Sequence, residues 1–351
     1  MKEHSILNST RASRRQFLTT AATAAVAAPL VLRQARAASK ELVFVTWGGT
    51  YRTALEEGLV KPFSAETGIS VKIIDTPDLA KIKAQVQTGN VQWDVFDAIN
   101  WQAFFGSNHG LWEPLDPALF DATDLTIPAR PDAAPLYNAM GVVAWDSKRT
   151  PDGKHPKNFV EYFDIANFPG RRTLRNRASE TLEMALLADG VPAAKLYPLD
   201  IDRAFKKLET IRPSVVKWVT ATPETISLVQ TGEADFTYSY PSRVKAAGDP
   251  MSCSFDQTLS QEEYLTVLKG APNKENAFKF LSWAVRPDIQ AATMEKLVLA
   301  PVSKKGFDML SSEARKWIHP VDSPSNALIN GAWWGENLEA IDRRFKEWVL
   351  L

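Results

Sequence analysis

The chain has 351 residues, with 41 basic and 41 acidic side chains. Residues 1–37 hold six of the basic residues and one acidic residue, so the remainder carries 35 basic against 40 acidic side chains, a net charge of −5. This balance argues against nucleic acid or an acidic membrane surface as the main partner. The single cysteine, Cys253, excludes an internal disulfide. The length that remains after residue 37 predicts two domains, at roughly 100–200 residues each.

The first 37 residues predict an export signal. Residues 13–18 read Ser-Arg-Arg-Gln-Phe-Leu, an apolar stretch follows over 18–32, and Ala-Arg-Ala at 35–37 is a small-x-small cleavage site. The alternative is an N-terminal membrane anchor, but about 15 mildly apolar residues are too few where a span needs about 20. We therefore expect a twin-arginine signal peptide over 1–37 and a mature protein in a bacterial periplasm.

The first half of the mature chain alternates between strands and helices. The apolar run 42–45 predicts a buried strand, the glycines at 48–49 break it, and apolar spacing predicts a helix over 51–63. A strand over 69–74, a helix over 79–86, a strand over 92–98 and a short helix follow. This order predicts a parallel sheet with right-handed crossovers. Trp47 and Trp101 would then lie at the carboxyl-terminal edge of that sheet, where ligands collect in open α/β folds.

The second half predicts another α/β unit and two connecting strands. Five prolines in 112–136 indicate irregular loop. The apolar segments 140–145 and 263–268 predict strands that cross between two lobes. Further strands are expected over 171–175, 215–219 and 235–240, and helices over 158–166, 179–189, 199–211, 223–231, 241–247, 273–285, 287–297 and 336–350. We expect one lobe to consist of 38–140 plus 268–320 and the other of 141–267 plus 321–351.

The sequence contains no recognisable motif for catalysis, metal or nucleotides. The four histidines are not spaced as a metal pair, and Cys253 has no histidine near it in the chain. The phosphate-binding glycine patterns and the nucleophile elbow are also absent from the sequence. We therefore expect no cofactor, no metal and no catalytic residue, with a periplasmic enzyme of unknown chemistry as the alternative from another class.

Short motifs along residues 41–350 carry a family resemblance. In order they are WGGTY at 47–51, PFSAETGI at 62–69, FPGRR at 168–172, ALLADGV at 185–191, YPLDIDRAF at 197–205, KGAPNK at 269–274 and WWGEN at 333–337. Together they resemble the solute-binding proteins of ABC importers, in the spermidine/putrescine-type branch. The resemblance implies a type II periplasmic binding protein: two α/β lobes, each with a mainly parallel sheet flanked by helices, joined by crossing strands. It also implies a ligand cleft that closes by hinge motion, a monomer, and an inner-membrane ABC permease as partner.

The resemblance also implies which residues bind the ligand. Aromatic residues of the first lobe would enclose an amine, and carboxylates would neutralise it. The positions that match the family's site are Trp47, Gly48, Tyr51, Asn100, Trp101, Glu180, Tyr240, Glu263 and Trp334, and Arg243 lies in the same region. Simpler interpretations stay open for Glu180 as a charge in a first helical turn, for Arg243 as a solvated residue, and for Trp334 as packing between lobes.

One departure from the family pattern bears on the ligand. Arg177 stands where the family offers a second acid, and Arg243 is nearby, while Glu180 and Glu263 remain acidic. A polyamine needs carboxylates and aromatic faces, whereas arginine suits a carboxylate, phosphonate or phosphate. We therefore expect a small amine-bearing solute, a zwitterion rather than a polyamine, with polyamine binding as the alternative.

Overall fold

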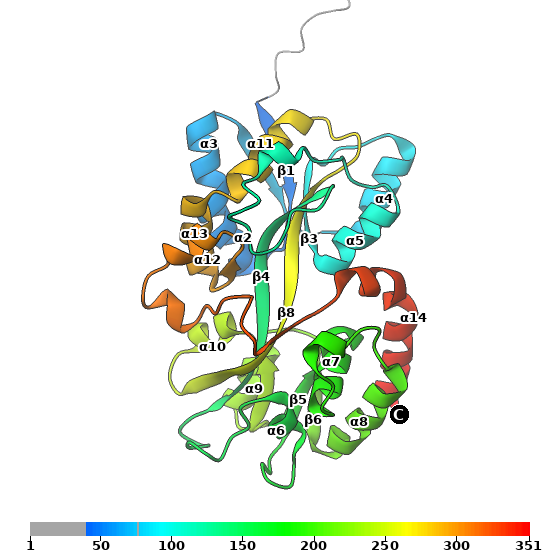
Figure 1. Ribbon diagram of the computed structural model, residues 1–351, viewed down its shortest axis with the longest axis vertical. Coiled ribbons are helices and arrows are strands. Elements are labelled where there is room, and N and C mark those ends of the chain that lie inside the picture. Colours follow the sequence, from blue (N-terminus) through cyan, green and yellow to red (C-terminus); the bar gives the residue numbers. More distant parts are fainter. Residues whose placement is uncertain (1–39, 76) are drawn as a thin grey trace, which may run out of the picture. The chain divides into compact units, whose positions relative to one another are not determined.

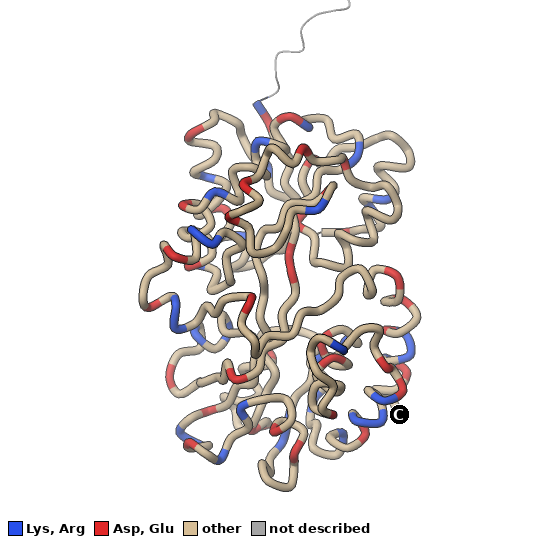
Figure 2. Tube along the Cα trace, viewed as in Figure 1, with Lys and Arg blue, Asp and Glu red and all other residues tan. Residues whose placement is uncertain are grey.

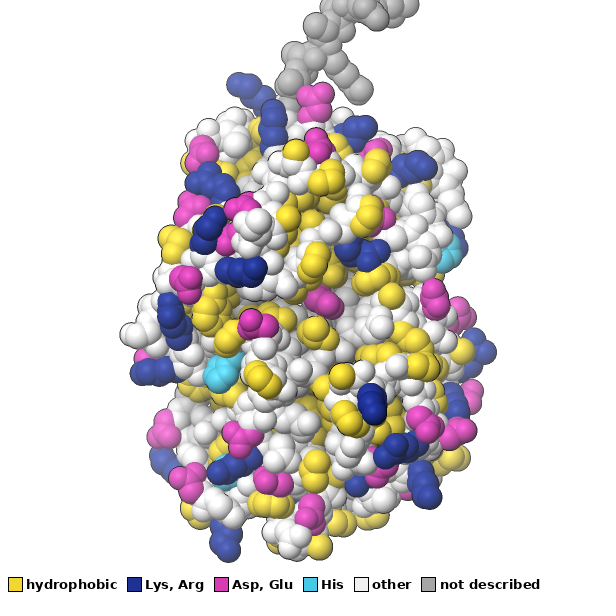
Figure 3. Space-filling model, viewed as in Figure 1, with side chains coloured by type: hydrophobic (Ala, Val, Ile, Leu, Met, Phe, Trp, Pro, Cys, Tyr) yellow, Lys and Arg dark blue, Asp and Glu magenta, His cyan; other side chains and the backbone are white. Residues whose placement is uncertain are grey.

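The computed structural model describes residues 40–75 and 77–351, which form one compact unit from Lys40 to Leu351. The expected signal peptide at 1–37 lies outside the described residues. Within them, no helix combines the length and the apolar character that a membrane span requires. On the face shown in Figure 3, acidic and basic side chains are interspersed over the helices and loops.

The described strands form one mixed sheet (Figure 1). At one end β1 (Glu41–Val45) lies between β2 (Ser70–Ile74) and β3 (Val95–Ile99), and both pairings are parallel. At the other end β5 (Arg172–Arg175) lies between β6 (Val215–Val219) and β7 (Phe236–Ser239), again in parallel pairs. The two ends thus repeat the arrangement that the alternating elements predicted.

Two long strands join the ends of the sheet. β4 (Ala133–Asp146) and β8 (Met251–Val267) pair with each other in antiparallel fashion, β8 continues to β3, and β4 continues to β7. Both strands begin earlier than the predicted segments 140–145 and 263–268. The start of β4 was expected to be loop because it contains Pro135, but the ladder changes register between Pro135 and Tyr137, a position where proline is tolerated. Short strands β9 (Ala300–Pro301) and β10 (Asn326–Leu328) pair with β4 and β8.

Helices cover the sheet, largely where apolar spacing placed them. The predicted helix 51–63 is in fact α2 (Gly49–Leu55), a π-helical turn (Glu56–Val60) and α3 (Lys61–Thr67) in succession. The π-helical turn contains Gly58, where a Cβ atom would lie 2.7 Å from Thr293 Oγ1. The other helices are α4 (Leu79–Thr88), α5 (Asn100–Asn108), α6 (Phe159–Phe163), α7 (Ala178–Ala188), α8 (Ile201–Ile211), α9 (Glu224–Gln230), α10 (Pro241–Ala247), α11 (Lys274–Ala284), α12 (Pro287–Leu297), α13 (Lys304–Asp308) and α14 (Gly331–Leu350).

Local signals set the start of several helices. The side chains of Asp78 and Asp200 accept hydrogen bonds from backbone N–H groups of the first turns of α4 and α8, the usual way to satisfy these donors. Pro241 and Pro287 occupy the first positions of α10 and α12. Ser179, expected to cap α7, and the next residue, Glu180, have non-helical backbone conformations, so the regular part of α7 begins only after Glu180.

Each end of the sheet has its own apolar core. One cluster packs β1–β3 against α3 and α11, with Phe44 and Phe63 in contact with Phe280. Another packs β5 and β7 against α6, α7, α8 and α14, with Tyr162 and Tyr238 among its fully buried side chains. Burial of one such aromatic ring contributes about 1.5–3 kcal/mol. The predicted lobe boundaries stay a prediction.

Helix α14 contacts both ends of the sheet. Its first turn packs on α5, where a Cβ atom on Gly331 would lie 2.8 Å from Asn100 Cβ. Further along, its aromatic residues Phe345 and Trp348 pack on Phe205 of α8 and Trp218 of β6. Besides β4 and β8, the C-terminal segment is thus a third connection between the two cores.

Candidate functional site

Strands β3 and β8 bring two carboxyl groups together at the middle of the sheet. Asp97 lies opposite Leu265, and Ile99 lies opposite Glu263, so Asp97 and Glu263 are diagonal neighbours on the same face. Both side chains are buried, with 0% and 2% exposure. Tyr137 of β4 lies opposite Glu263 and shares that face. Figure 2 shows the acidic segment of β8 near the centre of the sheet.

Neutral donors surround these carboxyl groups. Asp97 Oδ2 accepts hydrogen bonds from Thr46 Oγ1 at 2.6 Å and Tyr51 Oη at 2.9 Å. Glu263 Oε1 accepts one from Trp47 Nε1 at 2.9 Å. Asp97 Oδ1 is buried and has no hydrogen-bond partner among the described residues. We call Thr46, Trp47, Tyr51, Asp97 and Glu263 the acidic cluster; no lysine, arginine or histidine in residues 40–75 or 77–351 forms a salt bridge with its carboxyl groups.

Burial controls the ionisation of the acidic cluster. Burial raises the pKa of Asp97 to about 6, although the hydrogen bonds from Thr46 and Tyr51 oppose this. Burial and the neighbouring charge of Asp97 raise the pKa of Glu263 well above its usual value. Two like charges removed from water are unfavourable unless a proton or a cation compensates them. The acidic cluster is therefore a place where a bound cation would be stabilised.

A second polar cluster lies at the ends of β5 and β7. Arg177, the N-cap of α7, donates from Nε to Glu180 Oε2 at 2.9 Å and from Nη2 to the hydroxyl of Tyr240 at 2.8 Å. The hydroxyl of Tyr240 in turn donates to Glu180 Oε1 at 2.8 Å. Glu180 has φ +74°, an uncommon conformation for a non-glycine residue that marks functional positions in many proteins. In this second cluster, unlike the acidic cluster, the carboxylate is compensated within the protein.

Arg175 adds a second guanidinium to this region. It is the last residue of β5 and only 5% exposed. Its Nη2 atom donates to Thr220 O and Thr222 Oγ1, both at 3.3 Å, while its Nε and Nη1 atoms are buried without a partner. Buried guanidinium donors of this kind bind carboxylates and phosphates strongly. We call Arg175, Arg177, Glu180 and Tyr240 the arginine cluster.

The two clusters lie within electrostatic reach of each other. Burial and Asp97 raise the pKa of Glu263, and the positive charge of Arg177 acts in the opposite direction. Between the two ends of the sheet, a narrow cavity of about 10 Å³ is lined by Asn138 and Met140 of β4, by Tyr240, and by Val298 and Ala300. A space of that size holds about one water molecule, so the residues that line it approach one another closely there.

The remaining predicted site residues lie elsewhere. Gly48 is exposed at the N-cap of α2. Asn100 is fully buried and holds α5 in place through Nδ2, which donates to Ile329 O at 3.1 Å and Glu262 Oε2 at 3.2 Å. Arg243 forms no side-chain hydrogen bond or ion pair with the described residues.

The two predicted site tryptophans at α5 and α14 make no hydrogen bond with the residues of either cluster in the part of the chain that the structure describes. Trp101 lines a separate hollow of about 790 Å³ between α5 and α14, together with Phe105 and Leu338. Trp334 is fully buried in the core at the β5 end, and its Nε1 donates to Glu183 Oε1 at 2.6 Å. Trp334 thus packs within the core at the β5 end, and its role in ligand binding stays a prediction.

Sequence reasoning missed four residues of this region, namely Thr46, Asp97, Tyr137 and Arg175. The signal for Asp97 was an acid inside an otherwise apolar strand, Val95-Phe96-Asp97-Ala98, because such a residue is buried and needs a partner. Tyr137 lies between the segment expected to be loop, 112–136, and the predicted strand 140–145. Arg175 lies in the predicted strand 171–175, to which no binding role was assigned.

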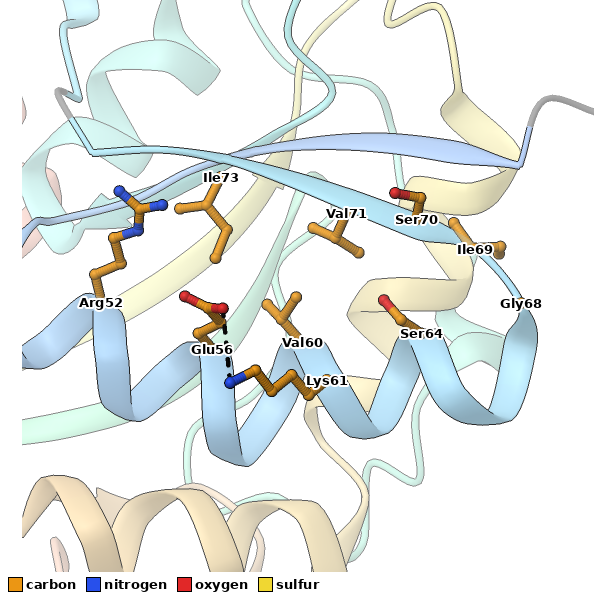
Figure 4. A pocket seen from close by; sticks show the side chains of 10 residues that line it. All are labelled: Arg52, Glu56, Val60, Lys61, Ser64, Gly68, Ile69, Ser70, Val71 and Ile73. Atoms are coloured by element: carbon orange, nitrogen blue, oxygen red, sulfur yellow. Dashed lines mark ion pairs between the residues drawn. The ribbon is translucent and has the colours of Figure 1, made fainter.

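A further hollow lies away from both clusters (Figure 4). It measures about 500 Å³ and lies between the helices α2–α3 and the edge strand β2. Arg52, Glu56 and Lys61 point into it above Val60 and Val71, with an ion pair from Lys61 to Glu56 at 3.8 Å. None of the predicted ligand-binding residues lines it. Among the described residues, no group of three or more histidine, cysteine, aspartate or glutamate side chains is arranged to hold a metal ion.

Comparison with known proteins supplies independent evidence. The model of the family described as bacterial extracellular solute-binding protein matches residues 58–317. A gamma-aminobutyric acid-binding protein of Pseudomonas aeruginosa is 31% identical over 328 residues, which cover 90% of this chain and 92% of that protein. Proteins named for binding spermidine and putrescine are more distant; that of Haemophilus influenzae is 24% identical over 87% of each chain.

Solved structures agree with this similarity. The structure of a GABA receptor has a TM-score of 0.82 and 32% identity, and the match covers 88% of this chain and 97% of that one. An ABC transporter substrate-binding protein from Bradyrhizobium japonicum has a TM-score of 0.81 and 35% identity, over 88% and 99% of the two chains. The likeness confirms the predicted two-lobed α/β fold, with the qualification that the central strands β4 and β8 make the sheet mixed.

Proposed function

This chain belongs to the bacterial extracellular solute-binding proteins, and we propose that it captures a small zwitterion with an amine at one end and an acid group at the other. It serves an ABC transporter, to whose inner-membrane permease it would deliver the solute. The observation that carries this proposal is the contrast between the two clusters: one holds two buried carboxyl groups without a cation, and the other holds two guanidinium groups with only one carboxylate between them.

The amine end of the solute belongs at the acidic cluster. An ammonium group placed between Asp97 and Glu263 supplies the positive charge that these buried groups lack. Trp47 and Tyr51 lie around the same carboxyl groups and donate hydrogen bonds to them. Their aromatic faces offer cation–π contact, about 0.5–2 kcal/mol for each ring. This arrangement favours a primary amine over a neutral solute.

The acid end belongs at the arginine cluster. Arg175 has two buried nitrogen atoms free to donate, and Arg177 carries the second positive charge. Glu180 already compensates one of these charges, so a single carboxylate on the solute brings the cluster to neutrality. A second ammonium group at this position would meet two guanidinium groups and be repelled. Two of the relatives described above, one named for binding gamma-aminobutyric acid and one named as a GABA receptor, support this assignment, since gamma-aminobutyric acid carries one amine and one carboxylate.

We propose that the two ends close over the solute by hinge motion, which is common in periplasmic binding proteins. The cavity of about 10 Å³ beside Tyr240, which residues of both ends line, supports this proposal. The β4 and β8 strands and the segment before α14 would bend. We further propose that the protein acts as a monomer in the periplasm and is exported by the twin-arginine route through residues 1–37.

Four ligands with a common four-carbon skeleton test the proposal. Isothermal titration calorimetry of the protein with 4-aminobutanoate, putrescine, butylamine and butanoate separates the two ends. We expect 4-aminobutanoate to bind most tightly, and each of the other three to bind at least about tenfold more weakly, a difference of about 1.4 kcal/mol. Tighter binding of putrescine than of 4-aminobutanoate would overturn the zwitterion assignment in favour of a polyamine. Equal binding of butylamine and 4-aminobutanoate would remove the role of the arginine cluster.

The second candidate function is polyamine binding. It is favoured by the acidic cluster, which has two carboxyl groups and no cation, and by the more distant relatives named for spermidine and putrescine. Spermidine therefore belongs in the same titration series. Affinity for spermidine above that for 4-aminobutanoate would support this candidate over the zwitterion.

A further inference from the structure

A buried carboxyl group outside the ligand clusters links the two ends of the sheet. Glu183 lies on α7, one turn after Glu180, and is 0% exposed. Its Oε1 atom accepts two hydrogen bonds of 2.6 Å, one from Trp334 Nε1 on α14 and one from the hydroxyl of Tyr197. Its Oε2 atom is buried without a partner. A buried carboxylate with only neutral donors is costly, and apolar packing of α7 on α14 does not require it.

The position of Glu183 connects it to both clusters. Through Trp334 it holds α14, whose first turn packs on α5 at Gly331 and Asn100. Helix α5 directly follows β3, the strand that carries Asp97. On its own helix, Glu183 follows the turn that carries Glu180 of the arginine cluster. The contact between α7 and α14 thus lies on a continuous chain of packed groups that joins one cluster to the other.

We propose that Glu183 is a positioning residue that holds α14 against α7 and sets, in a proton-dependent manner, how readily the two clusters close on the ligand. This inference rests on the proposed function, because closure is measured through ligand binding. In the closed arrangement Glu183 is desolvated, so its neutral form fits there. Loosening of the contact between α7 and α14 would admit water and favour the ionised form. Protonation therefore favours closure.

The surroundings of Glu183 make its ionisation relevant near neutral pH. Burial raises the pKa of Glu183 to about 7, and the hydrogen bonds from Tyr197 and Trp334 oppose this. The ionisable neighbours on α7 are Arg177 and Glu180, which pair with each other. On α14, Asp342 accepts a hydrogen bond from Ala178 N at the start of α7 and pairs with Lys346. From the segment before α8, the ionisable group that contacts Glu183 is Tyr197. No basic residue among those described forms an ion pair with Glu183.

The test compares the pH dependence of affinity in two proteins. The dissociation constant of 4-aminobutanoate is measured for the wild type and for Glu183→Gln from pH 6 to pH 8.5. Because both proteins contain the same acidic cluster, the ratio of the two constants cancels the titration of Asp97 and Glu263. We expect the wild-type constant to rise relative to that of the variant by about three- to tenfold across this range, as Glu183 ionises.

A matched control separates this role from a purely structural one. The Nε1 atom of Trp348 on α14 donates a hydrogen bond to Glu209 of α8. This contact, like that of Glu183, joins a tryptophan of α14 to a glutamate, but it is exposed to solvent. For Glu209→Gln, we expect the ratio of the wild-type dissociation constant to that of the variant to stay constant from pH 6 to pH 8.5. A ratio that is also flat for Glu183→Gln overturns the proposal, even if that variant melts at a lower temperature, since a structural role changes stability without changing this ratio.

A second variant keeps the test decisive if Glu183→Gln does not fold. Tyr197→Phe removes one of the two donors to Glu183 and retains the carboxyl group. The ionised form then loses a hydrogen bond, so the pH at which affinity falls should rise. An unchanged pH midpoint would contradict the inference. Absence of binding of any amine or zwitterion to the wild type would instead overturn the proposed function.

Discussion

The acidic cluster and the arginine cluster hold carboxyl groups in opposite electrostatic states. Asp97 and Glu263 are buried with neutral donors only, whereas Glu180 is paired with Arg177 within the protein. The acidic cluster is built on the antiparallel pair β3 and β8 beside the end of β1, and the arginine cluster lies at the ends of the parallel strands β5 and β7. Both clusters contain a tyrosine hydroxyl bonded to a carboxylate. The number of acids is therefore a poor guide to where the amine and the acid group of the ligand bind. The position of the compensating cation within the protein is the better indicator.

The largest effect should come from removing one charge of the acidic cluster. Asp97→Asn keeps the shape of the side chain but leaves a ligand ammonium with one fewer carboxylate, and loss of one member of a buried charge pair costs roughly 2–5 kcal/mol. We expect affinity for 4-aminobutanoate to fall by at least about 30-fold in calorimetry. Asp75→Asn, which breaks a surface pair with Arg52, is the matched control. A loss below about threefold for Asp97→Asn would remove the acidic cluster from the site.

The same variant should stabilise the ligand-free protein at neutral pH. Burial raises the pKa of Asp97 from 3.8 to about 6, so the folded state binds the proton more tightly than the unfolded chain. Stability from this group is therefore present below about pH 4 and is lost as pH rises to about 6. At pH 7.5 the loss is up to about 3 kcal/mol, at about 1.4 kcal/mol per pKa unit. Asp97→Asn should raise the melting temperature at pH 7.5, and much less at pH 4.5; the opposite order would show that Asp97 is compensated.

Removal of the cation from the arginine cluster should make it resemble the acidic cluster. Arg177→Gln leaves Glu180 buried without a charged partner, and this end of the site then favours an ammonium. We expect the affinity ratio of 4-aminobutanoate to putrescine to fall by about 10- to 100-fold, or roughly 1.4–2.8 kcal/mol. Arg171→Gln, which breaks an exposed pair with Asp235, serves as control. An unchanged ratio would show that Arg177 does not contact the acid end.

The tryptophans should differ according to which cluster they touch. Trp47→Ala removes a hydrogen bond to Glu263 and an aromatic face, so we expect affinity to fall by about tenfold. Trp101→Ala removes a side chain that lines the hollow between α5 and α14 and should change affinity by less than about threefold. Ligand-dependent tryptophan fluorescence should likewise be lost in the first variant and kept in the second. Equal losses in both would place Trp101 in the site after all.

The smallest effect is expected at Gly48. Its φ of −80° suits any residue, and a Cβ atom there would meet Asp75 at an ordinary distance of 3.5 Å. Gly48→Ala should therefore change affinity and melting temperature very little. A tenfold loss of affinity would mean that the ligand approaches the backbone at Gly48, as the sequence-based prediction assumed. Calorimetry with 4-aminobutanoate distinguishes these results.

The family and the fold class followed from the sequence. Membership in the solute-binding proteins confirms the prediction of an ABC transporter binding protein that is not an enzyme. The narrower spermidine/putrescine-type branch stays a prediction, and the gamma-aminobutyric acid-binding protein matches this chain better than the polyamine binders do. The presence of Arg177 in place of an acid had already indicated this direction. The export route and the lobe boundaries stay predictions.

What the sequence determined by itself is the set of local elements. The period of apolar residues places the strands and helices, because burial of one face requires it, and prolines start α10 and α12 where the sequence predicted. Only the tertiary structure decided which charges are compensated. Asp94 directly precedes β3, and Asp97 lies three residues further along the chain, within that strand. Asp94 accepts hydrogen bonds from the backbone N–H groups of Val43 and Asn273. Asp97 instead faces Thr46, Tyr51 and Glu263. The groups that surround a carboxylate come from segments far away in the chain. The residues next to an aspartate in the sequence therefore do not distinguish a structural aspartate from one that binds a ligand.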